Sequence, residues 1–226
     1  MEFCTWLEAH GSSCLEFVAV VFGIVSVWLS TRENILSWPT AIVNVSLFSV
    51  LFYRAGLYSD TGLQGVYFAL SVYGWYEWLY GGKNKTALAV STTSRRAWMM
   101  LIGIGVVSWL ILSTVTARLP GTALPRLDAA TTTISLIAMY LMTRKKVENW
   151  LLWVGVDVVY VGMFFYKGLY LTAFNYGVYL VISATGWFSW RRSLRETGDA
   201  PGNCGNGTHE DRNPRLDPVP GSGIVR

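Results

Sequence analysis

The residues best suited to chemistry lie in one apolar segment of the second half of the chain: Trp150, Trp153 and Asp157. They stand at positions i, i+3 and i+7, so on an α-helix they share one face. A carboxylate in the middle of a membrane helix costs about 2.5–3.5 kcal/mol on insertion scales, so it should face a wet cavity or a partner. Indole rings beside it would stack on a flat, cationic ligand. The alternative is a structural hydrogen bond between Asp157 and a neighbouring helix.

Polar and aromatic side chains form similar faces on three other apolar segments. Gln64 and Tyr67 share one face, Asn175 and Tyr179 share another, and Asn44 lies two turns into a third segment. Amide groups would bond the polar groups of a ligand, or they would join helices at about 0.6–2 kcal/mol for each contact. The candidate substrate-binding residues are Trp150, Trp153, Asp157, Gln64, Asn44, Asn175, Tyr67 and Tyr179.

Other aromatic residues and glycines have simpler interpretations. Four tryptophans near segment ends are predicted to anchor helices at the membrane interface: Trp75, Trp78, Trp187 and Trp190. Four glycines are predicted to allow close contact between helices: Gly65, Gly74, Gly177 and Gly186.

Signals for catalysis, metals or cofactors are missing from the sequence. There is no H-E-x-x-H, Walker or G-x-S-x-G motif, and His10 and His209 lie outside the apolar segments. Cys4, Cys14 and Cys204 are far apart and form no C-x-x-C, so we expect small core or tail residues rather than a disulfide framework or a zinc site. We predict no catalytic residue, no metal site and no cofactor.

The composition indicates that a bilayer surrounds these segments. Apolar residues make up 52% of the chain, charged residues only 14%, and the mean hydropathy is +0.37. Spanning helices of about 20 residues are predicted in seven places: 15–31, 35–53, 61–80, 97–117, 126–143, 148–166 and 169–190. Residues 197–226 are rich in Gly, Pro, Asn and Asp, which predicts a disordered cytoplasmic tail.

The basic residues predict the orientation of the chain. With the N-terminus outside, eleven Lys and Arg residues of the loops fall inside and four fall outside, as the positive-inside rule favours. The net charge of +4 therefore reflects short orienting clusters, and we expect no nucleic-acid partner.

The sequence repeats itself at a separation of 112 residues. Ten of the 23 residues from 56 to 78 recur without a gap in 168–190. Weaker matches relate the first apolar segment to the fifth at the same offset. With three residues inserted, Glu33, Asn34 and Trp38 match Glu148, Asn149 and Trp153.

The repeat predicts an all-α polytopic membrane protein with seven transmembrane helices. Because three helices are an odd number, a linking fourth helix must return the chain, and the two three-helix repeats are then parallel. The predicted divisions are an outer segment 1–14, a first repeat 15–80, a cytoplasmic loop 81–96, a linking helix 97–117, a second repeat 126–191 and the tail. Parallel repeats are typical of transporters, with the substrate site between them near the midplane.

With these motifs, the chain from 15 to 192 resembles the bacterial PnuC family of nicotinamide riboside transporters. The resemblance rests on Trp38-Pro39, Gly56-Leu57-Tyr58 with Gln64 following, the segment 73–78, and Glu148-Asn149-Trp150 with Trp153 and Asp157. It implies a three-plus-one-plus-three arrangement similar to the SWEET fold, facilitated diffusion across the inner membrane, and a homotrimer. It also implies a cytosolic kinase that phosphorylates the imported substrate.

The sequence therefore predicts an inner-membrane facilitator for nicotinamide riboside, an NAD precursor, that works by alternating access. Thiamine is also flat and cationic, so a transporter of thiamine or another vitamin is the alternative within the class. A seven-helix receptor is the alternative outside it.

Overall fold

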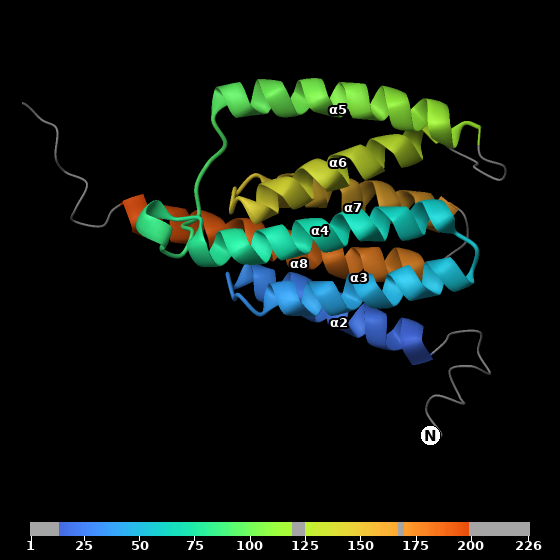
Figure 1. Ribbon diagram of the computed structural model, residues 1–226, viewed down its shortest axis with the longest axis horizontal. Coiled ribbons are helices and arrows are strands. Elements are labelled where there is room, and N and C mark those ends of the chain that lie inside the picture. Colours follow the sequence, from blue (N-terminus) through green and yellow to red (C-terminus); the bar gives the residue numbers. More distant parts are fainter. Residues whose placement is uncertain (1–13, 119–124, 167–169, 199–226) are drawn as a thin grey trace, which may run out of the picture.

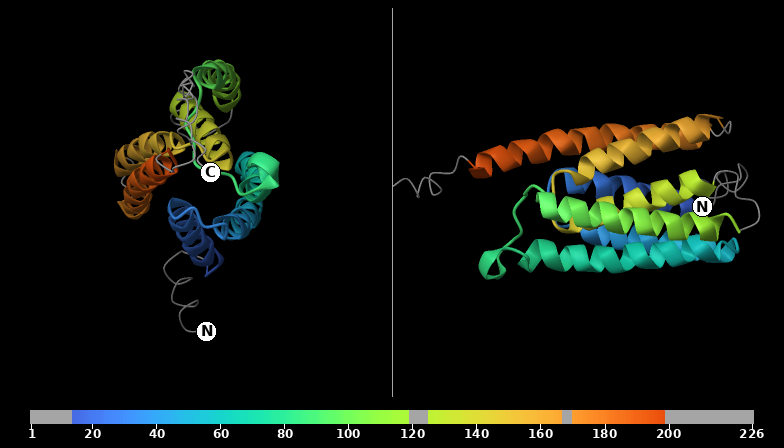
Figure 2. Two further views of the ribbon diagram at one scale, coloured as in Figure 1. Left: turned by 90° about the vertical axis from the view of Figure 1, so that its left-hand side faces the viewer. Right: turned by 90° about the horizontal axis from the view of Figure 1, so that it is seen from above.

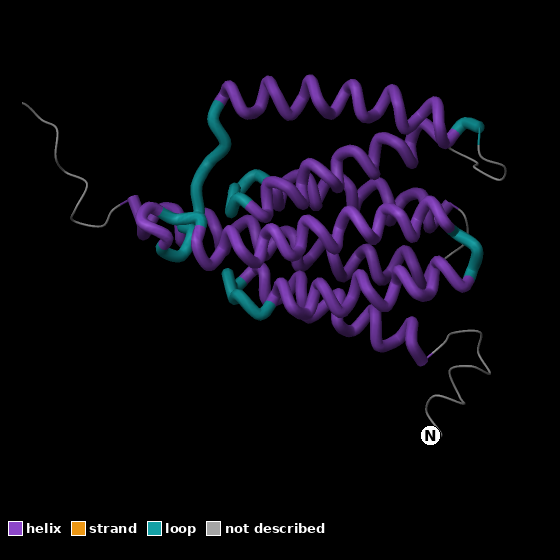
Figure 3. Tube along the Cα trace, in the orientation of Figure 1, coloured by secondary structure: helices purple, strands orange, loops and turns teal. Residues whose placement is uncertain are grey.

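The computed structural model describes residues 14–118, 125–166 and 170–198, which form α-helices joined by short turns (Figures 1 and 3). The predicted outer segment and most of the predicted tail lie outside these residues. The seven α-helices of the described part are α2 (Cys14–Thr31), α3 (Ser37–Arg54), α4 (Tyr58–Tyr80), α5 (Arg95–Thr116), α6 (Pro125–Thr143), α7 (Asn149–Tyr166) and α8 (Tyr170–Gly198). A short 3-10 helix, η1 (Lys83–Lys85), follows α4. The all-helical fold with a linking fourth helix is confirmed.

Six of the helices form a closed ring. Each contacts the next in the order α2, α3, α4, α6, α7, α8, and α8 returns to α2. The end-on view in Figure 2 shows this ring, with α5 outside it against α6. The first repeat is therefore α2 to α4, the second is α6 to α8, and α5 returns the chain between them. Contacts between the repeats run along α2 with α8 and along α4 with α6.

The two repeats keep one register throughout. The bounds of α3, Ser37–Arg54, and of α7, Asn149–Tyr166, differ by 112 residues, as do the starts of α4 and α8. The three-residue insertion assumed in the sequence alignment was wrong, because Trp38 and Trp150 occupy equivalent places. Each lies against the glycine of its repeat's third helix, Gly74 or Gly186, where an added Cβ would collide with the indole. The close contacts predicted at these two glycines are confirmed.

Gly65 and Gly177 differ from that prediction. An added Cβ at either position would meet nothing within 4 Å. The two glycines therefore mark no close helix contact within the described part of the chain.

The first helix of each repeat ends in a Schellman turn. The N–H of Glu33 donates to the carbonyl of Ser30, and the N–H of Asn34 donates to that of Leu29, both at 3.0 Å. The second repeat forms the same two bonds 112 residues later, with Lys145 in the place of Glu33. Both residues have positive φ, 53° for Glu33 and 46° for Lys145.

Hydropathy divides the helices into two groups. Within the described residues, α2, α5 and α7 are long and apolar enough on their own to cross a membrane. The other four long helices carry more polar side chains, and several of these line the interior of the ring, among them Asn44, Gln64, Ser135 and Asn175. These polar side chains contribute to the lower hydropathy of the four helices.

The turns between helices gather at two ends of the ring (Figure 1). One end holds the α2–α3 turn, the α6–α7 turn, the segment between α4 and α5, and the C-terminal part of α8. Most of the basic residues belong to these segments, so we name this the basic end. At the opposite end α2 begins with Cys14, which is disulfide-bonded. The expectation that the cysteines are only small core or tail residues was wrong for Cys14.

Candidate functional site

A cavity of about 420 Å³ lies inside the ring of six helices. Residues of α2, α3 and α4 form one side of its wall, and residues of α6, α7 and α8 form the other. The volume is within the range of about 300–1,000 Å³ that small-molecule sites occupy. The interface between the two repeats is therefore hollow, as the parallel-repeat prediction required.

Most wall residues come in pairs of equivalent positions, one from each repeat. Examples are Ala41 with Trp153, Asn44 with Val156, Val45 with Asp157, Leu63 with Asn175, Gln64 with Tyr176, Tyr67 with Tyr179, and Ser71 with Ser183. Some pairs keep the same residue type, as Tyr67 and Tyr179 do, whereas others differ in chemistry, as Val45 and Asp157 do. The two repeats thus place their backbones symmetrically around the cavity, but part of the side-chain chemistry differs between the two sides.

The second repeat contributes the acid and the indole. Asp157 is 4% exposed, and Ser183 Oγ on α8 donates to its Oδ2 at 3.1 Å. Among the described residues, no Lys or Arg forms an ion pair with this carboxylate. Trp153 lies one turn before it, and its Nε1 is buried without a hydrogen-bond partner in the described part of the chain. An uncompensated acid and an unused indole donor therefore border the same cavity.

The first repeat contributes amides. Gln64 of α4 lines the cavity, and so does Asn44 of α3, whose Nδ2 donates to the carbonyl of Ala19 at 2.6 Å. Gly23 of α2 makes room for this arrangement. A Cβ added there would lie 2.8 Å from Asn44 Nδ2 and 2.9 Å from the Tyr179 hydroxyl. The small residue lets groups from both repeats approach α2 at one point.

Seven of the eight candidate residues line this cavity: Asn44, Gln64, Tyr67, Trp153, Asp157, Asn175 and Tyr179. Trp150 does not, although it shares a helix face with Trp153 and Asp157. Its ring is fully buried, lies against Gly186 and meets Trp190 edge-to-face at a centroid distance of 5.4 Å. Trp150 therefore packs between helices, whereas the other seven candidates line the cavity.

Two of the tryptophans predicted to anchor helices at the membrane interface are instead buried in the protein. Trp78 is 3% exposed and Trp190 is fully buried, and their rings lie 5.8 Å apart in the middle of the basic end. An anchor would expose its ring to headgroups, so this prediction was wrong for both residues. Trp75 remains 38% exposed, as an anchor requires.

Several wall residues were missed by the sequence analysis. Trp38 lines the cavity from α3. Tyr160 and Tyr176 line it on the second-repeat side, with their ring centroids 4.7 Å apart and the rings tilted by 38°. Ser183, which lies within the repeated segment 168–190, is the hydrogen-bond donor to Asp157. The signal that would have found Tyr176 is its equivalence to Gln64 at the ungapped offset.

Comparisons with known proteins agree with this architecture. Residues 13–192 match the model of a family described as nicotinamide mononucleotide transporter. The nicotinamide riboside transporter PnuC of Escherichia coli is 31% identical, covering 82% of this chain and 88% of its own length. The riboflavin/roseoflavin transporter RibM of Streptomyces davaonensis is 28% identical, covering 80% of this chain and 87% of its own length.

A solved structure has the same fold. The crystal structure of the vitamin B3 transporter PnuC aligns with a TM-score of 0.65 and 26% identity, covering 85% of this chain and 86% of the crystallised one. The chain therefore belongs to the nicotinamide mononucleotide transporter family, the family of the PnuC membrane transporters.

Proposed function

We propose that this protein carries nicotinamide riboside across the bacterial inner membrane by facilitated diffusion. The observation that carries the proposal is the cavity between the repeats, where Trp153 adjoins an acid, Asp157, that has no cationic partner among the described residues. The relatives named as nicotinamide riboside transporters support the choice of substrate.

The chemistry of this substrate fits the division of the cavity wall. Nicotinamide riboside has a flat cationic ring, a carboxamide and ribose hydroxyls. In the proposed pose the ring lies on the second-repeat side, where Trp153 offers a stacking surface and Asp157 a counter-charge. The carboxamide and hydroxyls then face the first-repeat side, where Asn44, Gln64 and the Tyr67 hydroxyl lie, and Asn175 and Tyr179 of α8 offer further partners from the second repeat. Trp150 has no role in this pose.

Riboflavin is the substrate of a relative in the same family and is a second candidate. Its ring system is neutral, so its binding would leave the Asp157 carboxylate without compensation. Thiamine shares the flat cationic character of nicotinamide riboside and is the stronger competitor. A buried acid without a cationic partner among the described residues favours cationic ligands, because a neutral ligand does not offset its desolvation.

The orientation of the chain is part of the proposal. The excess of basic residues at one end supports a cytoplasmic location for that end under the positive-inside rule. The disulfide of Cys14 at the other end supports an oxidising compartment there, as in the periplasm. The N-terminus is then outside and the C-terminus inside. Phosphorylation by a cytosolic kinase would trap the imported substrate, and family resemblance suggests a homotrimer in the bilayer.

Two measurements test the proposal. Calorimetry on the purified protein with nicotinamide riboside, thiamine and riboflavin should rank nicotinamide riboside first. Proteoliposomes should then accumulate labelled nicotinamide riboside down its gradient, without a sodium or proton gradient. Binding without flux would favour a receptor, and preferred binding and flux of thiamine would replace the proposed substrate.

A further inference from the structure

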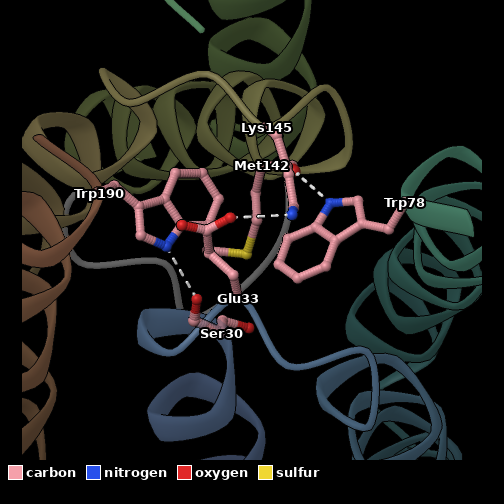
Figure 4. A network of polar contacts seen from close by, with 6 residues as sticks. All are labelled: Ser30, Glu33, Trp78, Met142, Lys145 and Trp190. Atoms are coloured by element: carbon pink, nitrogen blue, oxygen red, sulfur yellow. Dashed lines mark hydrogen bonds and ion pairs between the residues drawn. The ribbon is translucent and has the colours of Figure 1, made fainter. Parts of the chain in front are cut away.

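The two repeats are joined at the centre of the basic end by an ion pair between equivalent residues (Figure 4). Lys145 Nζ lies 3.0 Å from Glu33 Oε2, and the two residues are 112 apart in the sequence. In a two-fold arrangement, a residue can touch its own equivalent only at the axis. The pair therefore lies on the pseudo-two-fold axis that relates the repeats. We name it the axial ion pair.

Two indole hydrogen bonds flank the axial ion pair. Trp78 Nε1 donates to the carbonyl of Met142, and Trp190 Nε1 donates to the carbonyl of Ser30, both at 3.0 Å (Figure 4). These bonds are also equivalent, since each links the third helix of one repeat to the first helix of the other. Lys145 Nζ lies 4.6 Å from the centroid of the Trp78 ring, which adds a cation–π contact.

These links close one end of the cavity. Ser30 and Met142, whose carbonyls accept the two indole bonds, are themselves cavity-wall residues. The axial ion pair extends from the turns that directly follow them in the chain. A ligand that leaves the cavity through the centre of the basic end must therefore pass between the first-repeat turn that carries Glu33 and the second-repeat turn that carries Lys145.

The backbone at the pair indicates that its side chains are specifically required. Glu33 and Lys145 occupy the left-handed position of a Schellman turn, which glycine or asparagine usually takes. A long charged side chain in this conformation is strained. Both repeats keep such a residue at the equivalent position, and these two side chains are the ones that meet across the axis.

Lys145 belongs to a turn that is held by hydrogen bonds to the segment between α4 and α5. In the segment between α4 and α5, Ser91 N–H donates to the carbonyl of Lys145, and Val147 N–H donates to that of Ser91, both at 3.0 Å. Lys146 Nζ also donates to Ser91 Oγ at 2.8 Å. Among the described residues, the equivalent first-repeat turn, 32–36, has no such hydrogen bonds to another segment apart from the axial ion pair. The first-repeat turn is therefore the one that can move with fewer hydrogen bonds broken.

We propose that Glu33 and Lys145 form the gate of the transport path at the basic end, and that this structure holds the gate closed. On opening, the first-repeat turn moves away from the second-repeat turn, which the Ser91 hydrogen bonds hold in place. This movement breaks the axial ion pair and the two indole hydrogen bonds. Lys145 is 7% exposed and the Glu33 side chain is 25% exposed, so opening must bring the Lys145 ammonium into water as the pair separates. The inference rests on the proposed function, because a gate has meaning only where a ligand crosses.

A reversible cross-link tests the gate. Glu33→Cys and Lys145→Cys are combined in a chain with Cys204→Ser, and the purified protein is joined with a short bis-methanethiosulfonate reagent before reconstitution. The cross-linked protein should bind nicotinamide riboside within about twofold of the unlinked protein, while its flux falls by about tenfold or more. Cleaving the link with a reductant should restore flux. The matched control is Arg192→Cys with Glu196→Cys, an exposed pair within α8, whose cross-link should leave flux unchanged.

The outcomes separate the gate from the proposed function. Unchanged flux in the cross-linked gate variant overturns the gate, and so does loss of binding together with flux. A wild-type protein that neither binds nor carries nicotinamide riboside refutes the proposed function instead.

In that case the gate is tested without a substrate, through the labelling rate of a Ser30→Cys thiol by an impermeant reagent from the basic end. Glu33→Gln should raise this rate, and the charge-swapped pair Glu33→Lys with Lys145→Glu should return it toward the original value. Equal rates in all three proteins overturn the gate.

Discussion

Trp153 gives the sharpest test of the substrate pose, because it lines the cavity and its buried N–H has no hydrogen-bond partner among the described residues. Stacking on a cationic ring contributes about 0.5–2 kcal/mol. A hydrogen bond from the indole contributes about 0.5–1.5 kcal/mol. Trp153→Ala removes both, so binding should weaken by about 1–3.5 kcal/mol, or about 5-fold to 300-fold. Trp153→Phe keeps a ring and should lose only the hydrogen-bond part, about 5-fold.

The control is Trp150→Phe, one turn earlier on the same helix. Trp150 is fully buried against Gly186 and lies outside the cavity wall, so this change should lower the unfolding temperature and leave affinity unchanged. Calorimetry with nicotinamide riboside and thermal unfolding would be measured on the same monodisperse preparations. Wild-type affinity in Trp153→Ala, or an equal loss of affinity in Trp150→Phe, would refute the reasoning.

Further predictions concern the acid, a glycine, the tail and the topology. Asp157→Asn removes the counter-charge, so calorimetry should show affinity for the cationic substrate weakened by about 1–3 kcal/mol, with a smaller change for neutral riboflavin. Gly186→Ala forces a methyl group into an indole ring and should lower the unfolding temperature, whereas Gly155→Ala, with nothing within 4 Å, should maintain or raise it. Deleting residues 199–226 should leave uptake intact at equal membrane abundance, because this segment lacks an apolar face. In sealed cells an impermeant thiol reagent should not label Cys204, and ready labelling would contradict a cytoplasmic C-terminus.

Helices and the repeat were predictable because both leave strong marks in the sequence. Apolar runs of about 20 residues locate spanning helices, and fixed spacings of Gly, Trp and Tyr identify the duplicated third helix. Helix ends were less accurate: α8 continues to Gly198, eight residues beyond the predicted end at 190. Its last turns are polar and charged, so hydropathy could not include them.

The alignment within the second helix failed for an identifiable reason. Trp150 and Trp153 are three residues apart, and the alignment matched Trp38 to the wrong one. What distinguishes them is contact with Gly186 or with the cavity, which depends on the neighbouring helix α8. Trp150 was placed among the candidate ligand residues for a different reason: it shares a helix face with Trp153 and Asp157, and spacing along one helix does not show that its ring lies against Gly186 of α8.

The positions of Trp78 and Trp190 show another limit. A tryptophan near a helix end is equally suited to contact headgroups or to donate to a carbonyl of another helix. The carbonyls that these two indoles reach belong to Met142 and Ser30, which are 64 and 160 residues away in the chain. The spacing of residues along the sequence gives no information about such a contact, because it depends on how the two repeats pack against each other in three dimensions. An ungapped alignment would at least have shown Glu33 and Lys145 at equivalent positions with opposite charge.

The axial ion pair has a consequence for the origin of the fold. If a single three-helix unit paired with an identical copy, the residue on the axis would face itself, and carboxylate would oppose carboxylate or ammonium would oppose ammonium. Opposite charges can meet there only when the two halves have different sequences. Fusion of the halves into one chain, with α5 as the added helix, therefore permits a charge pairing that no homodimer of the unit could form. The same freedom allowed equivalent wall positions to diverge, so that Asp157 stands where the first repeat has Val45, and Gln64 stands where the second repeat has Tyr176.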